Sequence, residues 1–368
     1  MNLLFHCVYF PPEVGGLESH VYYLARALVK RGHRVKVVTS RSLPGVAKEE
    51  NMDGIQVFRT WFPSRSPSGW VAHALGSVPK TRELAREADL IHAQAFASVL
   101  PAAAGSRRSG TPLVATFHTS HFLTRAEKAM WRPILRRLVQ IPDYSLAASE
   151  EIAKVAMELA PGVEVEPLAN GVDTTFFRRV EAALPPGDRL RIVVPRRLFP
   201  KNGVEYFIRA FPLILKGVDA EAILIGDGPE RDRLKALSEE LGVSSHISFL
   251  GKRAHSEMPG LLSSGDLAVI PSLMEATSVA ALEAMACELP VVASNVGGLP
   301  EIVGAEVGGL FEPGNPEALA RAVLRAVDEG DLPGKGALAR KRVVERWSNE
   351  RLADRHLEIY SDLLHRGG

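Results

Sequence analysis

Short apolar runs alternate along the chain with longer segments in which apolar residues recur at helical spacing. The runs are apolar at nearly every position, which is typical of strands that are covered on both faces. The pattern therefore predicts an α/β fold with parallel sheets wrapped by helices. The predicted strands of the first half are 3–9, 35–39, 55–60, 90–93, 113–118 and 144–148. Those of the second half are 191–195, 222–226, 247–250, 267–271 and 291–294.

The same alternation restarts near residue 190, which indicates two domains in tandem. A chain of 368 residues is long for one hydrophobic core, and such chains generally divide. The stretch 170–190 has turn residues at both ends and a Pro-Pro-Gly sequence within it, so we interpret it as the linker. We expect domains at 1–170 and 171–345, and a closing helix at 346–368 that packs on either domain. Because open α/β sheets bind ligands at the carboxyl ends of their strands, an interdomain cleft is the expected site.

Composition and charge narrow the classes of partner. The chain has 44 Lys and Arg against 43 Asp and Glu, a net charge of +1 that does not favour a nucleic-acid partner. Cys7 and Cys287 lie in apolar runs without a Cys/His cluster of metal-ligand spacing, so we expect buried thiols and no metal site. The first residues lack the basic leader of a signal peptide, and no apolar run approaches the ~20 residues of a membrane span. A cytoplasmic location is therefore expected.

Two glycine-containing turns between a predicted strand and a predicted helix are candidate phosphate-binding loops. Gly15 and Gly16 precede the first helix, and Gly226 and Gly228 follow an apolar strand. Glycine lets the backbone approach a ligand closely, and a helix N-terminus offers free N–H groups. Each turn is equally interpretable as a tight connection. Neither has the full G-x-G-x-x-G spacing, which disfavours a dinucleotide-dependent oxidoreductase.

Three cations follow the first strand of the second half. Arg196, Arg197 and Lys201 stand where the strand 191–195 ends, in "VPRRLFPKNGV". Cations at the carboxyl end of a strand face the expected cleft, and guanidinium groups suit a diphosphate. The alternative is ordinary solvated surface charge.

Two carboxylates lie eight residues apart in "EATSVAALEAMACELP". If the intervening chain is helical, Glu275 and Glu283 are separated by about 12 Å, too far to share one proton or one metal ion. Carboxylates accept hydrogen bonds from hydroxyl groups, and a helix N-terminus between them suits phosphate. Hydroxyls at both ends with phosphate in the middle describe a nucleoside diphosphate sugar.

With these residues in hand, the whole chain resembles the retaining glycosyltransferases of family 4, which have the two-domain GT-B fold with Rossmann-like domains. The resemblance is carried by the order of seven motifs. They are "PPEVGGLESHV", "FHTSH", "AASEEIA", "NGVD", "RRLFPKNGV", "GDGPERDRL" and "EATSVAALEAMACELPVVASNVGGLPEIV".

The resemblance assigns roles to the matching residues. It implies that Glu275 binds the donor sugar hydroxyls, Glu283 the ribose hydroxyls and Arg197 the diphosphate. His118, at the end of "LVATFH", corresponds to a histidine near the reactive end of the sugar. The implied catalytic set is His118, Glu275, Arg197 and Lys201. The implied substrate-binding set is Gly15, Gly16, Asn170, Arg196, Gly226, Gly228, Ala276, Thr277, Ser278, Val279 and Glu283.

The chain departs from the family pattern at two places. The family usually has a lysine five residues after its arginine, but Asn202 stands five beyond Arg197. Either Lys201 takes that role or fewer charges hold the phosphate. The usual Gly-Phe after the first acid is replaced by Ala276-Thr277, which changes the contacts beside the sugar.

The resemblance also implies a reaction. A hexosyl group would move from GDP-mannose, UDP-glucose or UDP-N-acetylglucosamine to an acceptor hydroxyl, with retention at the anomeric carbon. The leaving phosphate would help to deprotonate the acceptor. The sequence contains no D-x-D motif for a catalytic metal, and no cofactor is expected.

The segment 121–140 combines five cations with Phe122, Trp131, Ile134 and Leu138. A basic amphipathic helix of this kind can lie on an anionic membrane, so a peripheral membrane contact on the cytoplasmic face is one interpretation. A solvated helix that covers the first sheet is the other. Pro133 argues against one uninterrupted helix.

Two other functions fit the same architecture. A nucleotide-sugar epimerase would need carboxylates placed for elimination and addition, which the spacing of the two acids does not suggest. A non-catalytic module that binds a nucleotide sugar differs from a transferase in that removal of Glu275 would leave its biological activity intact.

Overall fold

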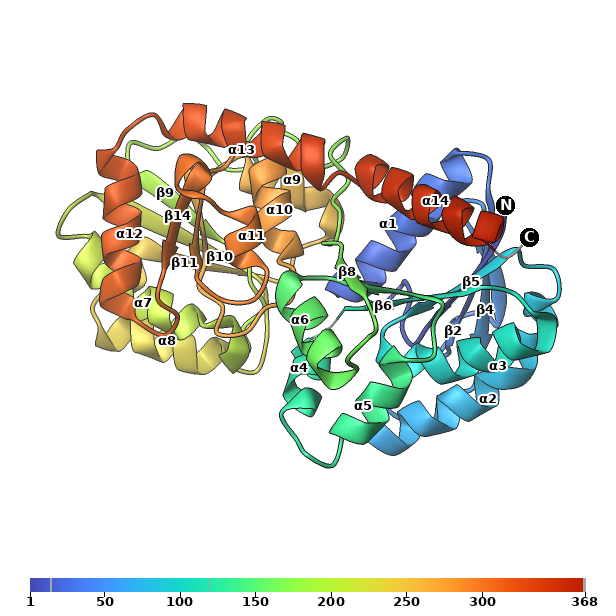
Figure 1. Cartoon of the computed structure of the whole chain (residues 1–368). Coiled ribbons are helices and arrows are strands. Elements are labelled where there is room, and N and C mark those ends of the chain that lie inside the picture. The colour runs from blue at the N-terminus through green and yellow to red at the C-terminus, as the bar shows by residue number, and fades with distance from the viewer. Residues whose placement is uncertain (14, 119, 367–368) are drawn as a thin grey trace. The chain divides into compact units, whose positions relative to one another are not determined.

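The computed structural model describes residues 1–13, 15–118 and 120–366, and its internal contacts divide the chain into two units (Figure 1). Unit 1 contains Met1–Gly171 and the C-terminal helix α14 (Asn349–Arg366), and unit 2 contains Val172–Ser348. Each unit is an α/β sheet with helices on both faces, as the apolar pattern predicted.

The sheet of unit 1 has the strand order β3-β4-β2-β1-β5-β6-β7-β8 and is parallel except for the pairing of β3 with β4. The helices α1 and α14 cover one face of this sheet, and α2 and α3 lie on the other (Figure 1). Its strands are β1 (Asn2–Cys7), β2 (Arg34–Ser40), β3 (Glu49–Met52), β4 (Ile55–Thr60), β5 (Leu90–Gln94), β6 (Leu113–Phe117), β7 (Tyr144–Ala147) and β8 (Val165–Pro167). Its other helices are α1 (Gly16–Lys30), α2 (Pro67–Ala85), η1 (Phe96–Ser98), α3 (Val99–Ser109), α4 (Ser120–Ala126), α5 (Arg132–Val139) and α6 (Glu150–Leu159).

The sheet of unit 2 is parallel and has the order β11-β10-β9-β12-β13-β14. Its central strands send alternate residues to two cores: Ile192 and Val194 pack with α7, α8 and α12, whereas Val193 packs with α9, α10, α11 and α13. The strands are β9 (Leu190–Val194), β10 (Ala220–Ile225), β11 (Ile247–Gly251), β12 (Leu267–Ile270), β13 (Val291–Ser294) and β14 (Gly308–Phe311). The helices are η2 (Pro200–Asn202), α7 (Val204–Ile214), α8 (Arg231–Glu240), η3 (Ser244–His246), η4 (His255–Glu257), α9 (Met258–Leu262), α10 (Val279–Ala286), α11 (Leu299–Ile302), η5 (Ala305–Val307), α12 (Pro316–Asp328) and α13 (Leu332–Arg346).

Every strand expected from the sequence is present, with its ends shifted by no more than about two residues. The strands β3, β8 and β14 were not predicted. The edge strand β3 is "EENM", β8 has 3 residues and β14 begins with two glycines, so none of them has an apolar β-branched run. Cys7 and Cys287 are buried thiols, as expected.

The closing helix belongs to unit 1. Leu352, Ile359 and Tyr360 of α14 are buried in the same core as α1, and in Figure 1 the red α14 lies beside the blue α1. An ion pair from Arg31 Nη2 to Asp354 Oδ1 (2.8 Å) fastens α14 to the end of α1. The Arg355 guanidinium donates to both carboxylate oxygens of Glu166, each at 2.8 Å, and ties α14 to β8. The amphipathic face of the closing helix therefore packs on the first unit.

Unit 1 holds a set of histidines in its interior. Burial lowers the pKa of each of them, to about 3 for His118 and about 4 for His73 and His356. The members of this set among the described residues are His6, His20, His73, His92, His118 and His356, each at most 4% exposed. They are therefore neutral near pH 7.

This set predicts that unit 1 is acid-labile. Each folded pKa lies below the unfolded value, so the unfolded chain binds more protons below about pH 6.5 and stability falls with falling pH. At pH 5 each neutral buried histidine disfavours the folded state by about 2 kcal/mol. Hydrogen exchange from pH 7 to pH 5 should show that unit 1 loses protection before unit 2. His73→Gln should flatten this dependence, and the same change at the exposed His365 should not. Loss of protection first in unit 2 would contradict the prediction.

Candidate functional site

In unit 2 the connections leave the central sheet in opposite directions at β9 and β12. From β9 the chain proceeds to β10 and β11 on one side, and from β12 to β13 and β14 on the other. Ligands of open α/β sheets bind outside the carboxyl ends of such a strand pair. The candidate cations follow β9 and the segment that begins at Ser272 follows β12, so the topology brings both to this point.

Backbone hydrogen bonds join the loops at this edge into one surface. The Leu198 N–H donates to the Asp227 carbonyl oxygen (3.0 Å), and the Leu273 N–H donates to that of Lys201 (2.8 Å). The Gly298 N–H donates to the Ala276 carbonyl oxygen (2.8 Å). The loops after β9, β10, β12 and β13 therefore support one another.

Gly226 and Gly228 have a packing function in this surface. A Cβ at Gly226 would lie 2.2 Å from the Arg196 carbonyl oxygen, and one at Gly228 would lie 2.3 Å from that of Leu198. Their small size therefore lets the loop after β10 approach the loop after β9. These contacts favour the tight-connection interpretation of this turn, and a phosphate contact stays a prediction.

An ion pair joins the ends of β9 and β12. Arg196 Nη2 lies 2.6 Å from Glu275 Oε2, and the two side chains are only 11% and 16% exposed. Arg196 Nη2 also donates to Asn202 Oδ1 (3.0 Å), while Asn202 Nδ2 donates to the Arg197 carbonyl oxygen (2.7 Å). Asn202, which stands where the family has a lysine, therefore orients Arg196 and the backbone of Arg197.

Arg197 and Lys201 differ from Arg196 in their surroundings. Arg197 is exposed, with its guanidinium carbon 5.5 Å from the centroid of the Phe199 ring, and no ion pair of this side chain exists among the described residues. The Lys201 side chain is exposed overall, yet protein atoms around its ammonium lower its pKa against the opposing effect of Glu275. Arg196 and Arg197 add to that lowering. Both side chains are available to an anion, whereas Arg196 is committed to Glu275.

The helix α10 begins shortly after Glu275. Ser278 caps the helix, its hydroxyl accepting from the Ala281 N–H (3.4 Å). Ala276 and Thr277 are buried, so this turn presents main-chain atoms rather than these two side chains to a ligand. The Val279 N–H donates to the Thr277 carbonyl oxygen (3.2 Å) and is thus engaged in this structure.

Glu283 lies on α10, one turn beyond its capped end. The residue is partly exposed, but desolvation of its carboxyl raises the pKa to about 8. Within the described ranges, no hydrogen bond or ion pair of this carboxyl is present. A carboxyl in such surroundings is stabilised by hydroxyl donors, and perturbed acids of this kind mark functional sites.

Unit 1 has an equivalent point between β1 and β5. Gly15 is extended and Gly16 begins α1 after β1, while His118 directly follows β6. His118 is buried, with Nδ1 3.2 Å from Asn170 Oδ1 and Nε2 2.6 Å from Gln94 Oε1. Burial lowers its pKa to about 3 against the opposing hydrogen bond of Asn170. Thr119 of the "FHTSH" motif lies outside the described residues.

Two residues around His118 were not found from the sequence. Gln94 ends β5 and contacts His118 directly. The ring of His20, on α1, has its centroid 4.6 Å from that of His118, and in the described part of the chain neither of its ring nitrogens has a hydrogen-bond partner. Gln94 directly follows the predicted strand 90–93, and this position is the feature of the sequence that could have identified it as a site residue.

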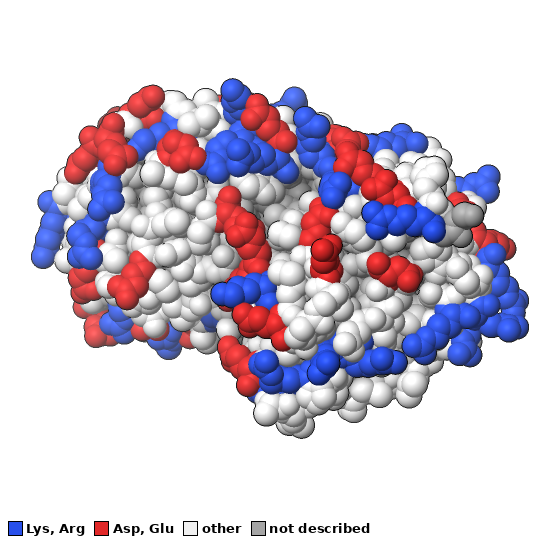
Figure 2. All heavy atoms as spheres, in the orientation of Figure 1, with Lys and Arg blue, Asp and Glu red and all other residues white. Residues whose placement is uncertain are grey.

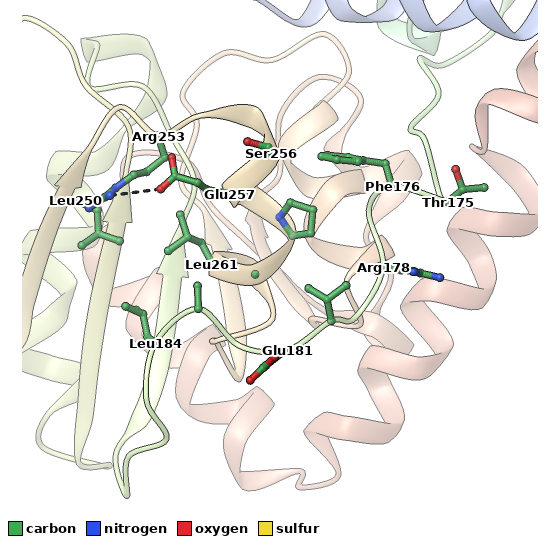
Figure 3. Close-up of a pocket in the computed structure, with 14 residues that line it drawn as sticks. Thr175, Phe176, Arg178, Glu181, Leu184, Leu250, Arg253, Ser256, Glu257 and Leu261 are labelled. Carbon is green, nitrogen blue, oxygen red and sulfur yellow. Dashed lines mark ion pairs between the residues drawn. The ribbon is translucent and has the colours of Figure 1, made fainter.

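A hollow of about 680 Å³ lies elsewhere in unit 2, between residues 175–184 and α9 (Figure 3). Its lining includes an ion pair from Arg253 to Glu257 (3.5 Å) and the apolar side chains of Leu184 and Leu261. The Phe176 ring stacks on His255 beside it, with centroids 5.0 Å apart. None of the predicted site residues lines this hollow. Among the described residues, no group of His, Cys, Asp and Glu is placed to hold a metal ion.

Relatives in sequence cover nearly the whole chain. An uncharacterized glycosyltransferase of Methanocaldococcus jannaschii is 30% identical over 95% of both chains. The GPI3 subunit of the phosphatidylinositol N-acetylglucosaminyltransferase of Saccharomyces cerevisiae is 26% identical over 89% of this chain and 75% of its own. The N-acetyl-alpha-D-glucosaminyl L-malate synthase of Bacillus anthracis is 26% identical over 96% and 95%.

Solved structures show the same fold. Sucrose-phosphate synthase from Thermosynechococcus elongatus superimposes with a TM-score of 0.87 at 21% identity, covering 99% of both chains. Anabaena HepE in complex with UDP gives 0.77 at 23%, covering 98% of this chain and 100% of its own. Residues 14–176 match the model of Glycosyltransferase Family 4, and residues 177–340 match that of Glycosyl transferases group 1. The chain therefore belongs to the family 4, group 1 glycosyltransferases and has their GT-B fold of two α/β domains.

Proposed function

We propose that this glycosyltransferase moves a hexosyl group from a nucleoside diphosphate sugar to an acceptor hydroxyl, with retention at the anomeric carbon. The observation that carries the proposal is the largely buried pair of Arg196 and Glu275 at the point where the connections of the second sheet diverge. Glu283, whose carboxyl has a raised pKa, stands on the helix that starts beside this pair. An elongated ligand with hydroxyls at both ends suits these two acids.

In this proposal Glu275 accepts hydrogen bonds from the donor sugar, and Arg196 orients its carboxylate. The exposed Arg197 and Lys201 bind the diphosphate and stabilise the negative charge that develops when it leaves. The N-terminus of α10 adds partial positive charge. Positive groups of the chain itself thus act on the leaving group, and the phosphate oxygen takes the acceptor proton on the same face.

Glu283 of unit 2 and His118 of unit 1 each have a role in this proposal. Ribose hydroxyls that donate to Glu283 offset the desolvation that raises its pKa. His118 is neutral because burial lowers its pKa, so it acts near the sugar as a hydrogen-bonding group rather than as a cation. Asn170, 3.2 Å from His118, orients it.

The named relatives suggest donors and acceptors for a first trial. A Mycobacterium tuberculosis relative, 27% identical over 94% of both chains, is a GDP-mannose-dependent phosphatidylinositol monomannoside mannosyltransferase. The names of two others pair N-acetylglucosamine with phosphatidylinositol and with L-malate, and HepE was solved with UDP-glucose. We propose GDP-mannose, UDP-N-acetylglucosamine and UDP-glucose as donors, with inositol phospholipid and small hydroxy acids as acceptor classes.

We also propose a peripheral membrane contact for unit 1. Met130 and Ile134 are 74% and 48% exposed, and the exposed Arg132, Arg136 and Arg137 lie on α5 around them. Figure 2 shows Lys and Arg in a band over α5 and α3. Protruding apolar groups among cations suit an anionic lipid surface. Within the described ranges, none of the helices has the length and apolarity that a bilayer crossing requires.

Arg125 does not belong to this contact. Its guanidinium carbon lies 5.2 Å from the ring centroids of Trp70, Phe96 and Trp131, and burial lowers its pKa. It therefore joins α4 to α2 and η1. Because α4 ends at Ala126 and α5 begins at Arg132, Pro133 stands in the first turn of a new helix.

Substitutions of Glu283 and Glu275 should have different effects, the first on nucleotide binding and the second on turnover. Glu283→Gln should weaken UDP or GDP binding by about 10-fold, measured by calorimetry, because the ribose hydroxyls lose a carboxyl acceptor. Glu275→Gln should leave nucleotide affinity within about 3-fold and lower kcat by at least about 100-fold. Glu240→Gln, an exposed change on α8, is the control. Product NMR should show a retained anomeric configuration. If no nucleotide or nucleotide sugar raised the melting temperature of the wild type, the proposal would be wrong.

The glycine behind Glu275 should be required for the same site. Gly297 has φ +54°, and a Cβ there would lie 1.9 Å from the Glu275 carbonyl oxygen. Gly297→Ala should lower Tm by at least about 4 °C through strain and should weaken nucleotide-sugar binding. Gly309→Ala, where no atom lies within 4 Å of the new Cβ, is the matched control. Equal Tm values for the two variants would contradict this account of the loop.

The membrane contact can be tested by co-sedimentation with vesicles. Vesicles of phosphatidylcholine with 30% phosphatidylglycerol, roughly the charge of an anionic leaflet, should bind the protein, and pure phosphatidylcholine should not. Arg136→Glu with Arg137→Glu should weaken binding by at least about 10-fold. The pair Arg321→Glu and Arg325→Glu on α12 makes the same charge change in unit 2 and should have little effect. Equal loss from both pairs would indicate nonspecific attraction and refute this surface.

A further inference from the structure

A buried chain of hydrogen bonds connects His118 to the C-terminal helix. His118 Nε2 lies 2.6 Å from Gln94 Oε1, and Gln94 Nε2 lies 3.3 Å from His92 Nδ1. His92 Nδ1 is also 2.6 Å from the Tyr360 hydroxyl of α14, and its Nε2 is 2.7 Å from Thr116 Oγ1. All five side chains are buried in unit 1. We call this set the His118 relay.

The donors and acceptors of the relay agree with one arrangement of hydrogens. Gln94 Oε1 can only accept, so Nε2 of a neutral His118 carries the hydrogen. The Gln94 amide nitrogen donates to His92 Nδ1, which therefore has a lone pair. The Tyr360 phenol stays protonated because burial raises its pKa, and at 2.6 Å it is the nearer of the two donors that share the single lone pair of His92 Nδ1. His92 Nε2–H then donates to Thr116 Oγ1.

The backbone beside Gln94 is held in a rare conformation. Ala95 has φ +78°, in the left-handed region that residues with a side chain rarely adopt. Its N–H donates to the Thr116 carbonyl oxygen (2.8 Å), so β6 holds the turn in place. Such strain persists where the surroundings over-determine it and often marks functional sites. Here it ends β5 with the Gln94 side chain between His92 and His118.

The arrangement determines what the other nitrogen of His118 can do. With the hydrogen on Nε2, Nδ1 is an acceptor, and the nearby Asn170 Oδ1 (3.2 Å) is an acceptor too. This pair of atoms is satisfied when the Asn170 amide turns its nitrogen inward or when a ligand O–H donates to Nδ1. The His20 ring, 4.6 Å from that of His118, limits the movement of the imidazole from α1.

We propose that Gln94, His92 and Tyr360 are positioning residues that keep His118 in its Nε2–H form, so that Nδ1 accepts a hydrogen bond from a hydroxyl of a bound substrate. This inference rests on the proposed role of His118 at the reactive end of the sugar. It makes α14, at the end of the chain, part of the support of the reaction site.

The tautomer can be measured without a substrate. Long-range ¹⁵N–¹H spectra of the whole protein with ¹⁵N-histidine, assigned with His118→Gln, should show His118 protonated on Nε2 alone at pH 7.5. A wild-type ring protonated on Nδ1 would overturn the proposal whatever the variants do. Tyr360→Phe should mix the two tautomers. Tyr144→Phe removes a hydroxyl that bonds Glu166 in the same unit and should leave the ring unchanged.

Gln94→Glu gives a second test because it replaces the amide with a carboxylate of the same shape. Among the described residues, the titratable groups near His118 include the neutral histidines His20, His92 and His356 and the Tyr360 phenol. The new carboxylate should raise the pKa of His118 and, with it, move the acidic limb of the pH–rate profile up by at least about 2 units. An unchanged spectrum and profile would overturn the proposal.

Steady-state kinetics distinguishes this inference from the proposed function. The assay follows release of UDP or GDP from whichever donor the wild type turns over. Tyr360→Phe should lower kcat by about 10-fold with the donor KM unchanged, and Tyr144→Phe should not. If the wild type turns over no nucleotide sugar, the proposed function fails, and the spectra alone still decide the tautomer. If it does and Tyr360→Phe matches the wild type in kcat and spectrum, the relay has no positioning role.

Discussion

Both sheets are covered by helices on two faces, and this constraint determines where the chain can place polar chemistry. A strand such as β9 sends alternate residues into two apolar cores, so neither face can accept a charge. Charged side chains must therefore lie where the strands end. Parallel strands end at the same edge, and the divergence of the connections at β9 and β12 leaves room there for Arg196 and Glu275. The loops of this edge are then packed around that ion pair.

Desolvation changes the pKa values of two candidate residues, Glu283 and His118, in opposite directions. It raises the pKa of Glu283 and lowers that of His118, so both tend toward their neutral forms near pH 7. A neutral imidazole and a carboxyl short of donors are suited to hydrogen bonds with hydroxyl groups. Arg196 instead keeps Glu275 beside a fixed positive charge. A ligand rich in hydroxyls and carrying a diphosphate complements this combination.

The C-terminal helix links stability and site in unit 1. The same helix that buries Leu352 and Ile359 against α1 carries Tyr360, whose hydroxyl contacts His92. Two ion pairs on its outer side fix its position along α1 and β8. Packing of this helix therefore completes the apolar core and the polar interior at once. The Tyr360 hydroxyl gives the deeply buried His92 one of its hydrogen-bond partners.

Local pattern was enough to determine the strands with apolar runs, the two-domain organisation of the family and the order of the motifs, because apolar runs and glycine turns act over a few residues. The sequence also indicated that Glu275 and Glu283 are too far apart to be an acid–base pair. Contacts between distant segments were decided only by the tertiary structure. In the sequence, Asn202 is only the absence of the usual lysine, whereas in the structure its amide orients Arg196. Gln94 is only the residue after a predicted strand, whereas in the structure the pairing of β5 with β6 brings it into contact with His118. The attachment of α14 to the first sheet was equally open, since an amphipathic helix shows that it needs a surface but not which surface it covers.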